Sequence, residues 1–148
     1  MNKKPTGLLP AAHTPFDATG DINLRVVSKQ VDRLIEMQCG GVYVGGTTGE
    51  CYSLTCDERI ALAGAWFDAA SDTDLSVVVH VGDNCIRNAQ TLAAQAESRG
   101  ADAIAAMAPC FFRPPTLDVL IGYLREISSA APNTPFYFYD IPVMTHVE

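Results

Sequence analysis

Short apolar runs alternate with amphipathic segments along the whole chain, and this alternation constrains the fold more than any other feature. The five runs are apolar throughout rather than at every second position, as expected for parallel strands that are covered on both faces. They span residues 8–12, 41–44, 75–81, 103–108 and 135–141. The pattern predicts an α/β protein.

Helical periodicity fills the intervals between these runs. Four helices are expected. The first runs from Asn23 to Gly40, the second begins at Thr55, the third ends at Gly100, and the fourth runs from Thr116 to Pro132. Asn23 is a candidate N-cap for the first helix. Thr55 and Glu58 have the spacing of a capping box, in which each side chain accepts a hydrogen bond from the other residue's amide.

The distance between successive strands is about 26–35 residues, the length of one unit in a (β/α)₈ barrel of about 250 residues. The alternative is a flavodoxin-like, doubly wound sheet, which also has five parallel strands in about 150 residues. That fold would normally close with a fifth helix and, in flavin or phosphate-binding versions, carry a Gly/Ser/Thr loop after the first strand. Here this position reads His13-Thr14-Pro15-Phe16. The sequence therefore favours the (β/α)₈ TIM barrel.

The sequence contains four strand–helix units and a fifth strand, and it ends at Glu148 shortly afterwards. A buried strand without its covering helix would leave an open sheet edge. We therefore interpret residues 1–148 as a single domain, the N-terminal part of a (β/α)₈ barrel with about five strands and four helices.

Composition excludes several classes of partner. The net charge is −7, which argues against binding to nucleic acid or to an anionic membrane. No apolar run approaches the roughly 20 residues that span a bilayer. The five cysteines are an odd number at irregular spacing, which favours free thiols and a cytoplasmic location.

The loop after the second predicted strand reads Gly45-Gly46-Thr47-Thr48-Gly49-Glu50. In parallel α/β proteins, functional residues lie where strands end. The glycines permit a tight turn with positive φ angles, which leaves several amides facing one concavity, and the two threonine hydroxyls add donors. The loop is therefore suited to a carboxylate or a phosphate. An ordinary glycine-rich turn with threonine caps is the alternative.

The fifth predicted strand ends at Tyr139, whose phenol at the mouth of a barrel can donate or accept a proton. The alternative is a core tyrosine in an aromatic strand. The histidines His13, His80 and His146 are isolated and have no metal-ligand spacing. No Gly-x-Ser-x-Gly motif is present. Neither a metal site nor a serine triad is therefore expected.

Together these motifs resemble the dihydrodipicolinate synthase/N-acetylneuraminate lyase family. The resemblance covers essentially the whole chain, with the motifs in the same order and at the same spacing. The matching residues are the 45–50 loop with Ser53-Leu54 and Glu58-Arg59 after it, Thr14-Pro15-Phe16, and Tyr139-Asp140-Ile141-Pro142.

Within this family the chain looks more like the animal-type lyases, to which His80-Val81-Gly82 and residues 108–114 are similar. The synthases usually have a relay tyrosine at the position of Phe112 and a substrate-binding arginine at that of Met144. Asp140 is a smaller departure, since many members have Asn or His there. The alternatives are a dihydrodipicolinate synthase or another 2-keto-3-deoxy sugar-acid aldolase.

The resemblance implies a class I aldolase mechanism, in which a lysine forms a Schiff base with C2 of a 2-oxo acid. The substrate would be N-acetylneuraminate, a sialic acid, and the products pyruvate and N-acetylmannosamine. No metal or other cofactor is expected. Full-length family members are commonly homotetramers.

The resemblance also assigns roles to residues of this chain. Thr48, with the amides from Gly46 to Gly49, would bind the carboxylate of pyruvate. The Tyr139 phenol would transfer the proton, and the Thr47 hydroxyl would orient that phenol.

The Schiff-base lysine of the family lies on the sixth strand, beyond the position of Tyr139. The lysines of this sequence are Lys3, Lys4 and Lys29, and none is expected to reach the pocket. This piece is therefore predicted to be inactive alone. A hypothesis of another class is that the half-barrel is a non-catalytic module that binds a carboxylate ligand or pairs with another chain.

Overall fold

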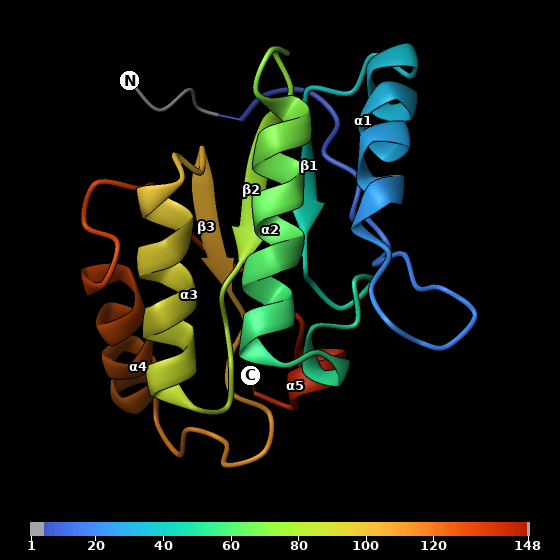
Figure 1. Cartoon of the computed structure of the whole chain (residues 1–148). Helices are drawn as coiled ribbons and strands as arrows, with labels where there is room; N and C mark the ends of the chain where they lie inside the picture. The colour runs from blue at the N-terminus through green and yellow to red at the C-terminus, as the bar shows by residue number, and fades with distance from the viewer. Residues whose placement is uncertain (1–4, 148) are drawn as a thin grey trace.

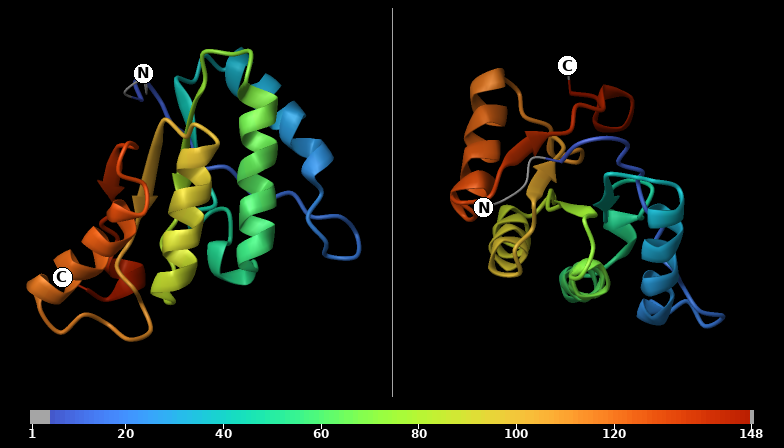
Figure 2. Two further views of the ribbon diagram at one scale, coloured as in Figure 1. Left: turned by 60° about the vertical axis from the view of Figure 1, so that its left-hand side comes forward. Right: turned by 90° about the horizontal axis from the view of Figure 1, so that it is seen from above.

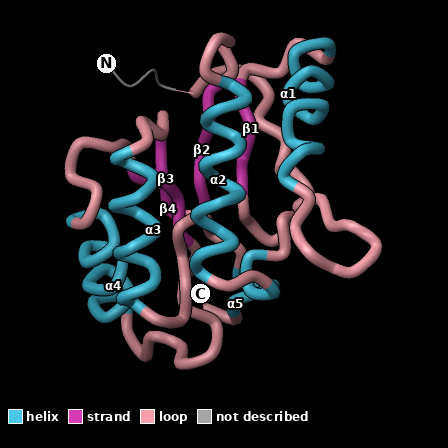
Figure 3. Tube along the Cα trace, viewed as in Figure 1, coloured by secondary structure: helices cyan, strands magenta, loops and turns pink. Residues whose placement is uncertain are grey.

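The computed structural model describes residues 5–147. It contains a parallel sheet with the strand order β1-β2-β3-β4 (Figure 1). The strands are β1 (Gly41–Val44), β2 (Ser76–His80), β3 (Ala103–Ala106) and β4 (Phe136–Phe138). The helices are α1 (Val27–Glu36), α2 (Cys56–Ala70), α3 (Ile86–Ser98), α4 (Leu117–Ser129) and the short α5 (Pro142–Thr145). Figure 3 shows these elements in the same view, with loops joining them.

The strand order follows the chain order, as in a barrel, whereas a doubly wound sheet reverses its order at a switch point. Seen from above, the helices α1 to α4 lie on the outside of an open arc and the strands lie on the inside (Figure 2). The α/β prediction is confirmed, and the flavodoxin-like alternative is wrong. The arc has a convex, helix-covered face and a concave face.

The first predicted strand, residues 8–12, is not a regular strand. Ala11 forms an isolated parallel bridge with Tyr43 of β1. The Tyr43 amide donates to Pro10 O and the Ala12 amide donates to Tyr43 O, both at 2.9 Å. The next bridge toward the N-terminus would need an amide hydrogen on Pro10, which proline lacks. The segment therefore lies beside β1 as an irregular edge.

The other predicted boundaries show similar local effects. The fifth predicted strand is shortened to Phe136–Phe138, and α5, which was not predicted, begins at Pro142. The capping box at α2 is confirmed, with the Glu58 amide donating to Thr55 Oγ1 and the Thr55 amide donating to Glu58 Oε2. The expected cap at Asn23 is wrong, because its side chain accepts no capping bond and a 3₁₀ turn, Leu24–Val26, precedes α1.

The main core lies between the sheet and its helices. Trp66 of α2 and Ile104 of β3 are fully buried there, and burying such a side chain stabilises the fold by about 1.5–3 kcal/mol. A smaller cluster of Val78, Ala103 and Ala105 covers the concave face with Tyr43 against it. Because the central strands are covered on both faces, their sequences are apolar at nearly every position.

No helix within residues 5–147 is long and apolar enough to cross a membrane. The five cysteines are all free thiols.

Candidate active site

The loop of residues 45–50 follows β1 at the carboxyl end of the sheet, toward which the arrows of Figure 1 point. Gly45 has a φ of +65°, which confirms the predicted left-handed turn at this glycine. No hydrogen bond of residues 5–147 has the amide of Thr47, Thr48 or Gly49 as its donor. Thr48 is exposed. The loop therefore presents free amide and hydroxyl donors, as an anion site requires.

Gly46 and Gly49 are required for space rather than for positive φ. A Cβ atom at Gly46 would lie 2.4 Å from Cε1 of Tyr43, and one at Gly49 would lie 3.1 Å from the Cα of Gly45. The buried hydroxyl of Thr14 donates to Gly49 O at 2.6 Å. The loop is thus packed against both Tyr43 and the segment before α1.

Tyr139 directly follows β4, and its amide donates to Ala106 O at 2.9 Å. Its half-buried ring meets the Tyr43 ring edge to face, with 5.8 Å between centroids and 72° between planes. The structure forms no hydrogen bond between Tyr139 and Thr47. Thr47 Oγ1 is buried and has no hydrogen-bond partner within residues 5–147. The role of Thr47 in orienting Tyr139 stays a prediction.

A hollow of about 450 Å³ lies on the concave face beside these groups. Tyr43, Val78, Ala105, Tyr137 and Tyr139 contribute to its lining. The structure therefore brings the phenol of Tyr139 to the concave side of the sheet, near the loop of residues 45–50 that follows β1. The site has a polar end at the carboxyl ends of the strands and an apolar floor formed by the sheet.

A buried polar network behind the loop was not identified from the sequence. The Tyr43 hydroxyl lies 2.9 Å from Nδ1 of His80, which is 1% exposed. Burial lowers the pKa of His80 to about 3, and the positive charge of Arg59 adds to this effect. Burial also raises the pKa of Tyr43, with a smaller effect from Tyr139. Both groups are therefore neutral at pH 7.

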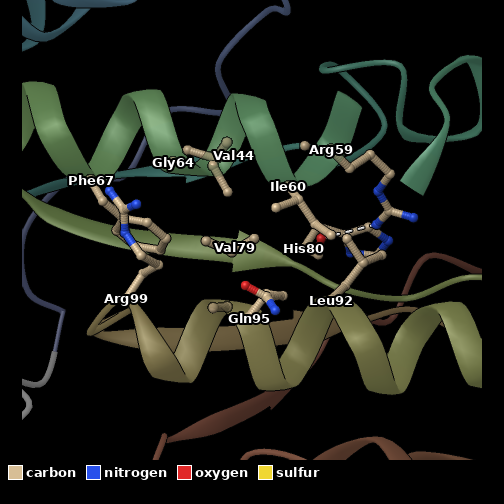
Figure 4. A pocket seen from close by; sticks show the side chains of 13 residues that line it. Val44, Arg59, Ile60, Gly64, Phe67, Val79, His80, Leu92, Gln95 and Arg99 are labelled. Carbon is tan, nitrogen blue, oxygen red and sulfur yellow. Dashed lines mark hydrogen bonds between the residues drawn. The ribbon is translucent and has the colours of Figure 1, made fainter. Parts of the chain in front are cut away.

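Arg59 of α2 holds this network in place. One of its terminal nitrogens donates to His80 O at 3.0 Å and to Gly82 O at 3.1 Å, and the other pairs with Asp83 at 3.2 Å. Figure 4 shows Arg59 and His80 at one end of a cavity of about 70 Å³ between α2, α3 and the sheet. This cavity lies on the convex side, so it is separate from the candidate site.

Lys29 is exposed on α1 and lines a hollow with Val42 and Trp66. These two side chains belong to the helix side of the sheet, so Lys29 lies on the opposite face from Tyr139. Lys3 and Lys4 lie outside the described residues. Phe112, at the position of the synthase tyrosine, is 83% exposed and stacks edge to face on Phe111. Met144 is exposed on α5.

Comparison with known proteins agrees with this geometry. N-acetylneuraminate lyase A from Xenopus laevis is 44% identical over 146 residues, covering 98% of this chain and 48% of the relative. N-acetylneuraminate lyase from Danio rerio is 46% identical over the same length and coverage. The solved structure of Proteus mirabilis N-acetylneuraminate lyase superposes with a TM-score of 0.91 at 35% identity, covering 96% of this chain and 48% of that one.

The chain therefore spans about half the length of the curated relatives it matches. Over that half, the fold and the order of the motifs agree with a partial (β/α)₈ barrel of the aldolase type. The dihydrodipicolinate synthetase family matches residues 4–148, nearly the entire sequence. The chain belongs to the dihydrodipicolinate synthetase family.

Proposed function

We propose that this chain forms the carboxylate-binding and proton-transferring half of a Schiff-base lyase. The complete enzyme would cleave N-acetylneuraminate into pyruvate and N-acetylmannosamine. The observation that carries the proposal is the loop at Thr47, Thr48 and Gly49, whose amides have no hydrogen-bond acceptor among residues 5–147, beside Tyr139 at the end of β4. The relatives named above are lyases for this substrate.

The pyruvate carboxylate would accept hydrogen bonds from the amides between Gly46 and Gly49 and from the Thr48 hydroxyl. Hydrogen bonds to a charged group contribute about 1.5–3 kcal/mol each. The loop is held by packing on Tyr43 and by the Thr14 hydrogen bond, so little reorganisation is needed on binding.

The Tyr139 phenol would relay a proton as the C3–C4 bond breaks: it accepts the proton of the substrate C4 hydroxyl and passes its own to the bound carboxylate, while the Schiff base takes up the electron pair of that bond. The Thr47 hydroxyl would orient the phenol. Lys29 lies on the other face of the sheet. We propose that the Schiff-base amine comes from the half of the relatives that this chain does not span, and that the 148-residue chain alone is inactive.

By the family resemblance, we also propose that the complete enzyme needs no cofactor and is a homotetramer. The five free thiols support a cytoplasmic location.

The test joins residues 1–148 to the remaining half of the Xenopus laevis lyase, at the end of the matched region. The folded chimera should release pyruvate from N-acetylneuraminate and form a borohydride-trapped adduct with pyruvate. The separate chain should keep its mass of 15.9 kDa under the same treatment. Tyr139→Phe should lower kcat of the chimera by about 10²–10⁴-fold, and Thr48→Val should raise KM.

An adduct on the separate chain would overturn the assignment of the amine to the other half. A chimera that traps pyruvate and leaves N-acetylneuraminate intact would overturn the substrate assignment.

A second candidate function is a non-catalytic module that pairs with another chain through the open edge of the sheet at β4. The observation in its favour is that Tyr137 and Phe138 of the last strand are about two-fifths exposed, at 42% and 43%. Sedimentation velocity over a concentration series tests it. A monomer at every concentration would refute self-pairing.

A further inference from the structure

Tyr43 lies between the two functional parts of the candidate site. It is on β1 and faces the concave side with Val78 and Ala105. On one side its ring occupies the space that a Cβ atom of Gly46 would need, with 2.4 Å to Cε1. On the other side the ring meets Tyr139 edge to face at 5.8 Å. One rigid ring therefore contacts both the anion loop and the proposed proton-transfer residue.

The Tyr43 ring is held at its far end by a buried partner. Its hydroxyl is 2.9 Å from Nδ1 of His80, and His80 is fully buried on β2. The backbone carbonyl of His80 accepts a hydrogen bond from Arg59, which is itself bound to Gly82 and Asp83. A side chain fixed by packing and by a hydrogen-bonded second layer is what keeps a catalytic group in its productive orientation.

We propose that Tyr43 is a positioning residue, anchored by His80, which sets the orientation of the Tyr139 ring relative to the loop of residues 46–49. The inference rests on the proposed function for the role of Tyr139 as the proton-transfer group. A purely structural tyrosine would contribute only the packing of its ring, and its hydroxyl would be dispensable. Removing the hydroxyl alone therefore separates the two roles.

The first experiment uses the 148-residue chain and does not depend on catalysis. Tyr43→Phe keeps the ring and removes the bond to His80. In spectra with ring-labelled tyrosine and histidine, we expect the His80 nitrogen shifts to change and the Tyr139 ring signals to move or broaden. Tyr137→Phe is the matched control, because it removes a tyrosine hydroxyl from the lining of the same hollow, on β4 rather than β1. It should leave both sets of signals in place. Unchanged Tyr139 signals in Tyr43→Phe would overturn the proposal.

The second experiment uses the chimera. Tyr43→Phe should lower kcat about 10-fold or more, because a misplaced catalytic group loses rate steeply, while KM changes by less than about twofold. His80→Asn offers Tyr43 a replacement acceptor, so this variant should retain a higher kcat than His80→Leu. A Tyr43→Phe enzyme with unchanged kcat would refute the positioning role. An inactive parent chimera would count against the proposed function alone, and the spectra would still decide the role of Tyr43.

Discussion

Acidification between pH 7 and pH 5 should destabilise the chain through His80. Burial, with the charge of Arg59, lowers the pKa of His80 from 6.5 to about 3 in the folded state. As the pH falls below 6.5, the unfolded chain takes up a proton at this position and the folded chain does not. Stability is therefore fully present above pH 6.5 and is lost progressively toward pH 3.

The magnitude follows from the width of this window. Each pH unit below 6.5 costs about 1.4 kcal/mol, so the free energy of unfolding should fall by about 2 kcal/mol between pH 7 and pH 5. The fold also lowers the pKa of Asp17, Glu58 and Glu97, whose ordinary values are 3.8, 4.5 and 4.5. These carboxylates change the free energy of unfolding mainly below pH 5. The change between pH 7 and pH 5 therefore reports on His80.

Urea unfolding at pH 7 and pH 5, followed by circular dichroism, measures the effect. His80→Asn has an amide oxygen that can accept from Tyr43 and no group that titrates in this range, so its stability should depend much less on pH. His13→Asn changes an exposed histidine and should retain the dependence of the parent chain. If His80→Asn loses as much stability as the parent between the two pH values, the assignment to His80 is wrong.

Three further substitutions test the backbone and the caps. Gly64→Ala in α2 should stabilise the chain by about 0.5–1 kcal/mol in thermal unfolding, since a Cβ there meets nothing within 4 Å and alanine favours a helix; a lower melting temperature would contradict this. Gly45→Ala also has open space, but its φ of +65° makes a side chain strained, so a loss of about 1 kcal/mol in urea is expected and a gain would refute it. Thr55→Ala removes the α2 capping box and should cost about 1 kcal/mol, measured by the urea midpoint, whereas Ser in its place should cost less.

The features that the sequence predicts well are those with local causes. The capping box at Thr55 and Glu58 involves residues three apart, and the start of α2 follows from it. The apolar runs of β1 and β3 identify buried parallel strands because helices and a concave-face cluster cover them. Pro10 weakened the first predicted strand through its missing amide hydrogen, a signal that the sequence contains.

The site was only partly predictable, because some of its contacts join residues that are far apart in the sequence. The 45–50 loop is contiguous, so its donors could be identified from the sequence. The pairing of Tyr43 with His80 depends on the register of β1 against β2, in which Tyr43 lies opposite Val78. One signal for this network was available: Arg59 shares the apolar face of α2 with Leu62 and Trp66, where a charged residue must find buried partners.

The Thr14 hydroxyl, which donates to Gly49 O, couples the loop of residues 45–50 to the segment before α1. The segment that contains Thr14 lies along β1 through few backbone bonds, because Pro10 cannot donate. Binding of an anion to the loop should slow exchange of the Ala12 amide hydrogen with solvent. By thermodynamic reciprocity, if anion binding stabilises this edge by a given free energy, ordering of the edge strengthens anion binding by the same amount. The N-terminal edge also lines the hollow of the candidate site through Leu9 and Ala11, so substitutions along this edge are expected to change the affinity of the loop for an anion.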